Sequence, residues 1–522
     1  MNRRHVLAGL ASGWGLSPTL WLAGCASPPQ PPSPSPATPE LSPAATWRVV
    51  NRLGWGANDT QMAEVARWGL STYLHHQLTG QATGAWPAGV QDQIGRLSIS
   101  QRSMADLLRS LEAQRKGADA QAGEDARKTA QQAYQQDMNR LAREAATRQL
   151  LRALHSPHAL QEHLTWFWFN HFNVHQSKHN LRAMVADFED SAIRPHALGS
   201  FRAMLGAVTR HPAMLRYLDN DQNAANRLNE NLGRELLELH TLGVHGGYSQ
   251  RDVQELARVL TGHGYSLDTE TPRLKPEWRA LHKRDGAYEF NPARHDFGDK
   301  TVLGQFITGK GAAELDEVLD RLALHPSTAR RLSFKLAQYL LADEPPSALV
   351  DRMAQAYLGS RGLIAPTLRV LLTAPEFSAE GPGKFKDPVH YVLSALRAAY
   401  DGRAIVNTQP VLGWINRLGQ GLYQRPTPDG YAATADAWNS PGQMSQRFEV
   451  ARAMGSGSAG LFKPEEPAGA AEQPAFPQLA RPAFYRWVQA GLGEGTRQAL
   501  AQAASPQDWN TLYLAAPEFM VR

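Results

Sequence analysis

Cysteine is nearly absent from this chain: Cys25 is the only one among 522 residues. A single thiol cannot form an intramolecular disulfide or a zinc site built from several cysteines. Cys25 also lies at the end of an apolar leader, where it is expected to be acylated. The mature protein would then carry no thiol, and a metal would have to use histidine, carboxylate or carbonyl ligands.

Common catalytic motifs and an excess of one charge are also missing. The sequence has no phosphate loop, no G-x-S-x-G nucleophile elbow and no H-E-x-x-H zinc pair. The formal net charge is +5, and removal of residues 1–24 with Arg3 and Arg4 leaves 52 basic against 49 acidic residues, or +3. This small, evenly spread charge gives no reason to expect nucleic acid as a partner.

The longest apolar stretch lies in "MNRRHVLAGLASGWGLSPTLWLAGC", residues 1–25. Its basic start, apolar centre and small residues before Cys25 resemble a bacterial lipoprotein signal, which implies a signal peptide over 1–24 and lipidation at Cys25. The alternative is an uncleaved transmembrane anchor, since about 18 apolar residues can just span a bilayer. Arg3 and Arg4 also resemble a twin-arginine export signal.

The expected lipid decides where the protein is found. Two or more acyl chains hold a protein stably on a membrane. Ala26 and Ser27, rather than an aspartate, follow Cys25. By resemblance to lipoprotein sorting rules, this implies the periplasmic face of the outer membrane. We therefore expect a protein of the cell envelope that binds the membrane through its lipid anchor.

Composition divides the rest of the chain. Residues 25–45 are rich in proline and predict an extended tether. A main domain is expected over 46–455, followed by a flexible Gly/Pro-rich loop over 456–480. Helices over 481–522 are expected to complete the main domain.

Helical spacing of apolar residues dominates the chain after the tether and predicts a mainly α fold, one large multi-helix domain. Helices are expected over 312–324, 326–341, 346–358, 361–373 and 385–400. Residues 101–153, rich in Ala, Gln, Arg and Glu, predict a protruding helical hairpin arm. Residues 264–304 are loop-rich, and the strand candidates "GAYEF" and "KTVLG" predict a small β-hairpin there.

The stretch "NENLGRELLELH", residues 229–240, is the first candidate site. On a helix, Arg234, Glu235 and Glu238 share one polar stripe with Asn231, and His240 points to the opposite side. Two carboxylates at this spacing can share a cation or shift each other's pKa for acid–base work. The structural alternative is an exposed Arg234–Glu238 pair, worth about 0.2–0.5 kcal/mol.

The second candidate is "WFWFNHFNV", where Asn170 and His171 end an aromatic helix. A histidine among aromatic rings is desolvated, which lowers its pKa and keeps it neutral. A neutral imidazole can act as a ligand or a base. The structural alternative is a core histidine with both nitrogens hydrogen-bonded.

Two loops complete the candidates. "RHDFGDKTVLG" places His295, Asp296, Asp299 and Lys300 close together, although Asp296 could equally cap a turn. The polar loop over 420–442 contains aromatic and amide side chains that suit sugar or peptide stacking, or plain loop packing.

These segments together resemble the bacterial domain-of-unknown-function family 1800. The motifs "NENLGRELLELHTLGVHGGYSQRDVQELARVLTG", "WFNHFNV", "HDFGDKTVLG", "FKDPVHYVLSALRAAY" and "LGQGLYQRPTPDG" occur in the family's order between about Trp47 and Ala453. The chain departs from the family at His240, where a Phe is common, and at "TGHGY". The resemblance implies an exported, largely helical protein, often encoded beside a second exported, sulfatase-like family, and it implies no reaction.

Two functions are compatible with these observations. In the first, the protein is an envelope enzyme, a hydrolase or a metal-dependent enzyme, with its site between helices. The candidate catalytic residues are Asn170, His171, Asn229, Glu230, Arg234, Glu235 and Glu238. A divalent metal would bind His171, Glu235 and Asp296. In the second, the protein is a non-catalytic lipoprotein that binds or assembles an exported partner protein or a polysaccharide.

Overall fold

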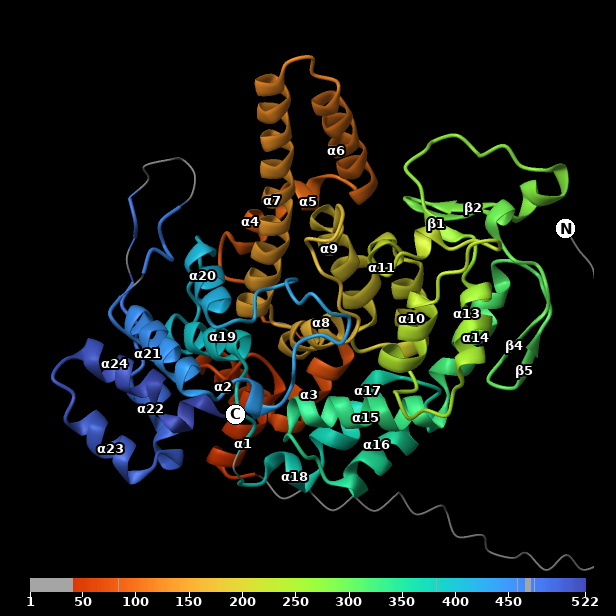
Figure 1. Cartoon of the computed structure of the whole chain (residues 1–522). Coiled ribbons are helices and arrows are strands. Elements are labelled where there is room, and N and C mark those ends of the chain that lie inside the picture. The colour runs from red at the N-terminus through yellow and green to blue at the C-terminus, as the bar shows by residue number, and fades with distance from the viewer. Residues whose placement is uncertain (1–40, 83, 382, 458, 465–470, 474) are drawn as a thin grey trace, which may run out of the picture. The chain divides into compact units, whose positions relative to one another are not determined.

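The computed structural model describes residues 41–522 apart from 83, 382, 458, 465–470 and 474. The expected signal peptide, Cys25 and residues 26–40 of the expected tether lie outside the described residues. The described part is mainly α, as predicted (Figure 1). Within these ranges, no helix combines the length and the apolar character that crossing a membrane requires.

The first helix begins slightly earlier than the sequence predicts. Pro43 occupies its first turn, and the Ser42 hydroxyl accepts a hydrogen bond from the Ala45 amide at 3.2 Å. Proline and a serine cap both favour a helix start, so residues 43–45 belong to this helix and not to a tether. The amino-terminal helices are α1 (Pro43–Leu53), α2 (Asp59–Trp68), α3 (Leu70–Thr79), α4 (Val90–Gly95) and α5 (Ser98–Gln101).

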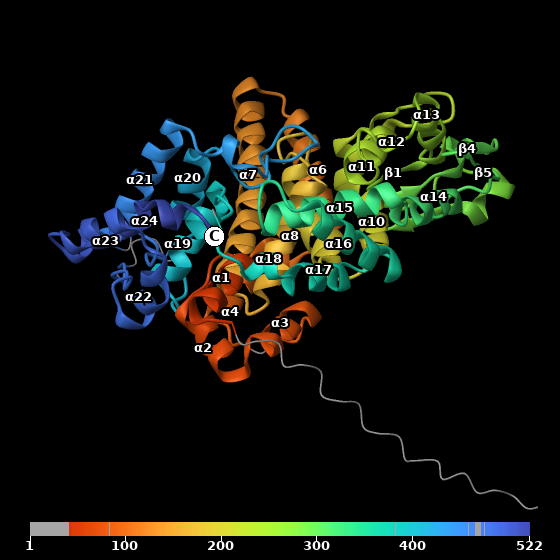
Figure 2. The ribbon, with the colours of Figure 1, turned by 90° about the horizontal axis from the view of Figure 1, so that it is seen from below.

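The predicted helical arm consists of α6 (Met104–Asp119) and α7 (Glu124–His155), which lie side by side and project from the body (Figures 1 and 2). All buried residues of α7 lie at Met138 or beyond it. The first part of α7 is therefore a largely solvated helix that packs against α6, and the second part anchors the arm in the body.

The aromatic helix α8 (Ala159–His171) lies at the centre of the fold. Trp168, Phe169 and the adjoining Phe172 are fully buried, and a helix that is apolar on nearly all sides has to be surrounded. The helices that follow it are α9 (Val185–Asp187), α10 (Phe201–Arg210), α11 (Pro212–Tyr217), α12 (Asn231–Glu235) and α13 (Gln250–Val259). Two wider, π-helical turns interrupt this series: η2 (Phe188–Ile193) and η5 (Leu236–His240).

The strands form two small antiparallel sheets instead of the single hairpin predicted from "GAYEF" and "KTVLG". The first sheet has the order β1–β3–β2, and the second pairs β4 with β5. Each candidate segment pairs with its own neighbour because a turn with positive φ follows or precedes it, at Gly286 in one case and at Leu303-Gly304 in the other. The strands are β1 (His263–Tyr265), β2 (Lys283–Asp285), β3 (Tyr288–Phe290), β4 (Lys300–Val302) and β5 (Gln305–Ile307).

The remaining helices cover the central helix from two sides. Helices α15 to α18 run beneath α8 in Figure 1, α14 lies with α10 and α13 on the side of the strands, and α20 to α24 lie on the far side of α7 from the strands (Figures 1 and 2). The five helices expected between 312 and 400 are all present. The bounds are α14 (Ala313–Ala323), α15 (Pro326–Leu340), α16 (Ser347–Gly359), α17 (Ile364–Leu372), α18 (Pro375–Ser378), α19 (Pro388–Ala399), α20 (Gln409–Arg417), α21 (Pro441–Gly455), α22 (Pro482–Val488), α23 (Glu494–Ala501) and α24 (Pro506–Ala515).

Candidate functional site

Two asparagines at the end of α8 hold the loop over 424–432. The Asn170 amide donates to the Tyr431 carbonyl at 2.9 Å, and its carbonyl oxygen accepts from the Tyr431 amide at 2.7 Å. The Asn173 amide donates to the carbonyls of Arg425 and Thr427 at 3.0 and 2.8 Å. Two segments more than 250 residues apart are thereby fixed against each other.

Gly430 makes this close approach possible. Its φ is +76°, and a Cβ built there would lie 2.2 Å from the backbone carbonyl oxygen of Asn170. Both the backbone conformation and the available space therefore require glycine. Asn170, predicted as a catalytic residue, is thus committed to holding the loop.

We expect Gly430→Ala to destabilise the protein by at least about 2 kcal/mol, because the methyl group must displace the loop or the end of α8. Thermal and urea unfolding measure the effect. Gly442→Ala is the matched control, since a Cβ at Gly442 meets nothing within 4 Å. Equal stabilities of the two variants would show that the loop yields freely.

His171 connects this helix end to two other elements. Its Nε2 lies 3.1 Å from the carbonyl oxygen of His240 in η5, and its Nδ1 lies 2.9 Å from the Nζ of Lys335 in α15. A carbonyl only accepts, so Nε2 carries the proton and Nδ1 accepts from Lys335. Burial, and after it the charge of Lys335, keeps the pKa of His171 well below its usual value. His171 is therefore a neutral residue that positions Lys335, with no nitrogen left for a metal.

Lys335 is the most unusual ionisable group at this place. Burial and, to a lesser extent, the neighbouring Arg331 guanidinium lower its pKa to about 7, against the opposing effect of Asp429. The Arg331 side chain itself donates to the Leu239 carbonyl at 3.1 Å. No carboxylate in the described part of the chain forms an ion pair with the Lys335 ammonium. An amine of this pKa, held next to another cation, is a typical nucleophile or general base.

The charges that act on Glu235 of α12 include Glu238 of η5 and Asp429. Burial raises the pKa of Glu235, and the charges of Glu238 and Asp429 raise it further, while Arg234 opposes them. Asp429 thus influences both Glu235 and Lys335. One carboxyl is pushed toward its neutral form and one amine toward its neutral form, which is the pattern of an acid–base pair.

Asp429 itself comes from the loop that the asparagines hold. Its carboxylate accepts hydrogen bonds from the Arg425 guanidinium and the Thr427 hydroxyl. The Tyr217 hydroxyl of α11 donates to the Pro426 carbonyl at 2.7 Å and fixes the loop from a third direction. The loop is therefore a rigid part of the site.

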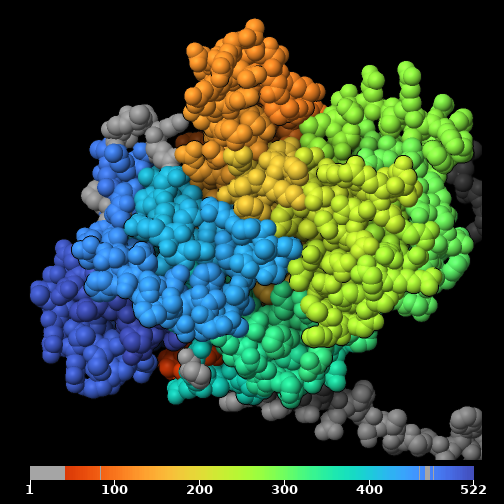
Figure 3. Space-filling model, viewed as in Figure 1, coloured from red at the N-terminus to blue at the C-terminus, as the bar shows by residue number. Residues whose placement is uncertain are grey.

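These elements surround a narrow hollow in the surface. In Figure 3 the light-blue segment that contains residues 420–440, the yellow-green segment of α11 and α12, and the green segment of α15 adjoin around it. In Figure 1 the end of α8 lies at the same place, behind the light-blue loop. Lys335 of α15 is half-buried, so that its amine is partly desolvated without being sealed from solvent. We call this place the Lys335 recess.

Four predicted catalytic residues, Asn229, Glu230, Arg234 and Glu238, have structural contacts instead of free functional groups. The Asn229 side-chain oxygen accepts from the Asn231 amide at 3.0 Å and begins α12. Arg234 pairs with Glu230 at 3.0 Å and with Glu238 at 3.6 Å, the structural alternative considered for this helix. His240 is buried, on the opposite side from the acids, as the helical projection predicts.

The expected metal ligands do not meet. Asp296 pairs with Arg258 of α13 at 2.7 Å, and His171 has both nitrogens bonded. His295 and Lys300, which are neighbours of Asp296 in the sequence, bond the buried Glu314 and fix the loop that contains Asp296. Their role is architectural. In the ranges that the structure describes, no group of three or more His, Cys, Asp or Glu side chains could hold a metal ion.

Lys335, Arg331 and Asp429 are the members of the site that the sequence did not reveal. Arg331 and Lys335 are four residues apart on the helix predicted over 326–341, and nothing in their spacing distinguishes them from other basic residues on helices. Asp429 lies in the 420–442 loop, which was considered only for its aromatic and amide groups. No local signal links the three.

Comparison with known proteins identifies one family. A family model described as "Protein of unknown function (DUF1800)" matches residues 48–521. No curated protein and no solved structure matches the chain.

Proposed function

The chain belongs to DUF1800, a family of proteins of unknown function, and from that premise we propose that it is a hydrolase whose site is the Lys335 recess. The observation that carries the proposal is the Lys335 amine, with a pKa near 7, a hydrogen bond to neutral His171 and no carboxylate partner in the described residues. Half of such amines are unprotonated at neutral pH. Lys335 can then take a proton from an attacking water molecule.

Glu235 completes the proposed chemistry. Its raised pKa leaves a larger protonated fraction than an exposed glutamate has. A protonated Glu235 can donate to the leaving group as Lys335 takes the proton of the attacking water, so that the two protons balance. Asp429 lies within electrostatic range of both groups and favours the charged Lys335 that results. His171 and Asn170 act as positioning residues, one for the amine and one for the loop.

Two measurements test this function on the purified mature protein. Labelling with acetic anhydride between pH 5 and 10, followed by peptide mass spectrometry, should give Lys335 a midpoint near pH 7, with the exposed Lys463 as the reference. A panel of p-nitrophenyl esters and glycosides should contain a substrate whose hydrolysis rises with pH through about 7. Lys335→Met should reduce that hydrolysis at least 100-fold, and Glu235→Gln should reduce it as well.

The opposite results are equally specific. A Lys335 midpoint near 10, or hydrolysis that survives in Lys335→Met, would reject the amine as the base. A protein that hydrolyses nothing in the panel, in either form, would favour the non-catalytic binding alternative.

We propose further that the protein acts in the cell envelope, attached through acylated Cys25. The leader sequence and its single cysteine support this proposal. Cys25→Ser should move the protein from the detergent phase to the aqueous phase in Triton X-114 partitioning, since loss of the acyl chains removes about 0.8 kcal/mol per buried CH₂. An unchanged partition would instead indicate the uncleaved transmembrane anchor.

A further inference from the structure

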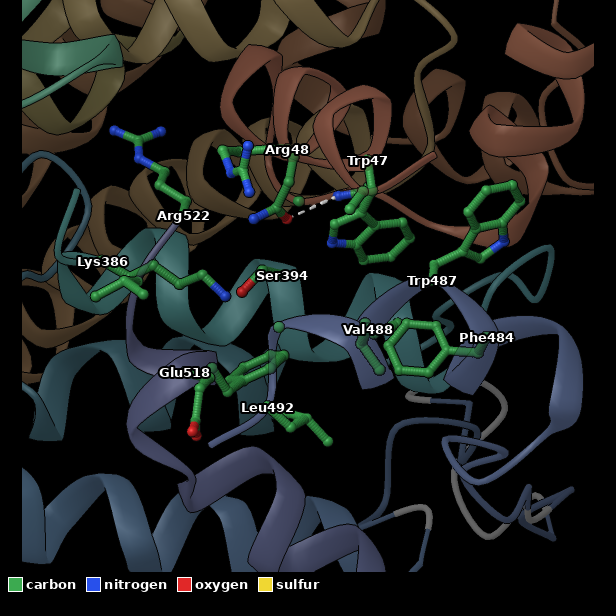
Figure 4. Close-up of a pocket in the computed structure, with 18 of the residues that line it drawn as sticks. Trp47, Arg48, Lys386, Ser394, Phe484, Trp487, Val488, Leu492, Glu518 and Arg522 are labelled. Atoms are coloured by element: carbon green, nitrogen blue, oxygen red, sulfur yellow. Dashed lines mark hydrogen bonds between the residues drawn. The ribbon is translucent and has the colours of Figure 1, made fainter. Parts of the chain in front are cut away.

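A second cavity, of about 330 Å³, lies between α1, α19, α22 and the end of the chain. Five aromatic side chains line it together with polar and small residues: Trp47, Phe484, Trp487, Tyr513 and Phe519 (Figure 4). Trp47 and Phe484 pack edge to face with their centroids 5.8 Å apart. The volume is in the range of small-molecule sites, about 300–1,000 Å³.

Lys386 is one of three basic residues in this lining, together with Arg48 and Arg522. The residue is 2% exposed, and its Nζ lies 3.7 Å from the centroid of the Phe519 ring. Figure 4 shows the side chain directed into the cavity toward Ser394. Within the described ranges the Lys386 ammonium has no ion pair and no hydrogen bond, and a buried cation without either is unfavourable by several kcal/mol.

The nearby carboxylates are used elsewhere. Glu518 accepts hydrogen bonds from the Gly493 amide at 2.6 Å and the Thr496 hydroxyl at 2.8 Å, and it points away from Lys386 in Figure 4. Asp387 caps α19 by accepting from the His390 amide at 2.9 Å. Burial, and after it the cations Arg522 and Arg447, keep the pKa of Lys386 well below its usual value, and an anion bound beside the amine would favour its charged form.

Three basic residues line the cavity against one carboxylate, Glu518, and this excess of positive charge is complementary to an anion. The surrounding rings complement a flat apolar body, and they leave room for one small molecule. We propose that this cavity binds a small aromatic carboxylate, with its carboxylate on the Lys386 ammonium and its ring between the side chains of α1 and α22. This inference is independent of the Lys335 recess, because the two sites share no lining residue.

Isothermal titration with 2-naphthoate and with 2-naphthylmethanol tests the proposal. The two probes have the same ring system and differ in charge. The mature wild-type protein should bind naphthoate at least tenfold more tightly than the alcohol. Lys386→Met should remove this preference, and it should remain folded because methionine relieves a buried charge; circular dichroism checks the fold. Lys463→Met, at an exposed lysine, should bind like the wild type.

Trp487→Ala supplies a second test, because loss of the ring should weaken both probes by a similar factor. Equal affinities of the two probes, an unchanged preference in Lys386→Met, or no binding of either probe to the wild type would each overturn the proposal. Lys335→Met should bind naphthoate normally, which separates this site from the proposed hydrolytic one.

Discussion

Lys335→Met is expected to stabilise the protein while it removes the proposed activity. The pKa of Lys335 falls from 10.5 to about 7 on folding, so the folded protein binds fewer protons than the unfolded chain between these values. Each pKa unit of difference between the folded and unfolded states corresponds to about 1.4 kcal/mol of stability. Because Lys335 is only half-buried, we take the loss of unfolding free energy caused by its charge below pH 7 as about 3 kcal/mol. The full pKa shift would correspond to a larger value.

The stability gained in Lys335→Met is reduced by the loss of a hydrogen bond. Methionine leaves the Nδ1 of His171 without its donor, which costs about 1 kcal/mol. The net increase should therefore be about 2 kcal/mol near pH 6, and it should disappear as the pH rises toward 10.5, where the lysine is neutral in both states. Urea unfolding of both proteins at pH 6, 8 and 10 measures this dependence. A variant that is less stable at pH 6 would show that Lys335 is not desolvated as described.

Arg194→Met is expected to have the largest destabilising effect. The Arg194 guanidinium bonds Glu162, Glu189 at 2.6 Å and Asp190 at 3.1 Å, and the side chains of Glu162 and Glu189 are only 6% and 3% exposed. It also donates to Gln149 of α7 at 3.1 Å. Removal of the cation leaves buried carboxylates without their partner, which costs roughly 3–5 kcal/mol.

The pH dependence of this loss identifies its cause. Burial raises the pKa of Glu189, and loss of the opposing Arg194 would raise it further, so the penalty is present at high pH and is relieved as the pH falls and Glu189 binds a proton. The deficit should therefore be smaller at pH 5 than at pH 8. Arg202→Met is the matched control, since its partners Asp316 and Asp320 are 52% and 67% exposed and such pairs contribute about 0–1 kcal/mol.

Addition of Glu162→Gln to Arg194→Met should recover part of the stability, because one buried charge is then removed with its partner. A deficit of equal size at both pH values would assign the loss to packing and not to charge.

The helices were predictable because each one depends on local spacing. Apolar residues at helical intervals placed α14 to α17 within a few residues of their observed bounds. The arm was predictable for the same reason, since a long segment without apolar clusters can only be a solvated helix. The two small sheets were not predictable from the sequence, because the pairing of three-residue strands depends on turns such as Leu303-Gly304 more than on the strands themselves.

The site was only partly predictable. The sequence correctly indicated that a histidine among aromatic rings would be desolvated, and His171 is. It could not show that His171 would bond a lysine 164 residues later. The low pKa of Lys335 depends on burial and on the charges of Arg331 and Asp429, and this environment forms only when the chain has folded.

The construction of the arm has a practical consequence. Because α7 is anchored in the body only from Met138 onward, the turn over 120–123 can accept an inserted epitope or fluorophore sequence, or a protease nick, without disturbing either the Lys335 recess or the aromatic cavity. Fragments cut at this turn should remain together on a sizing column, and a label placed there would report on neighbours that approach the protein from outside.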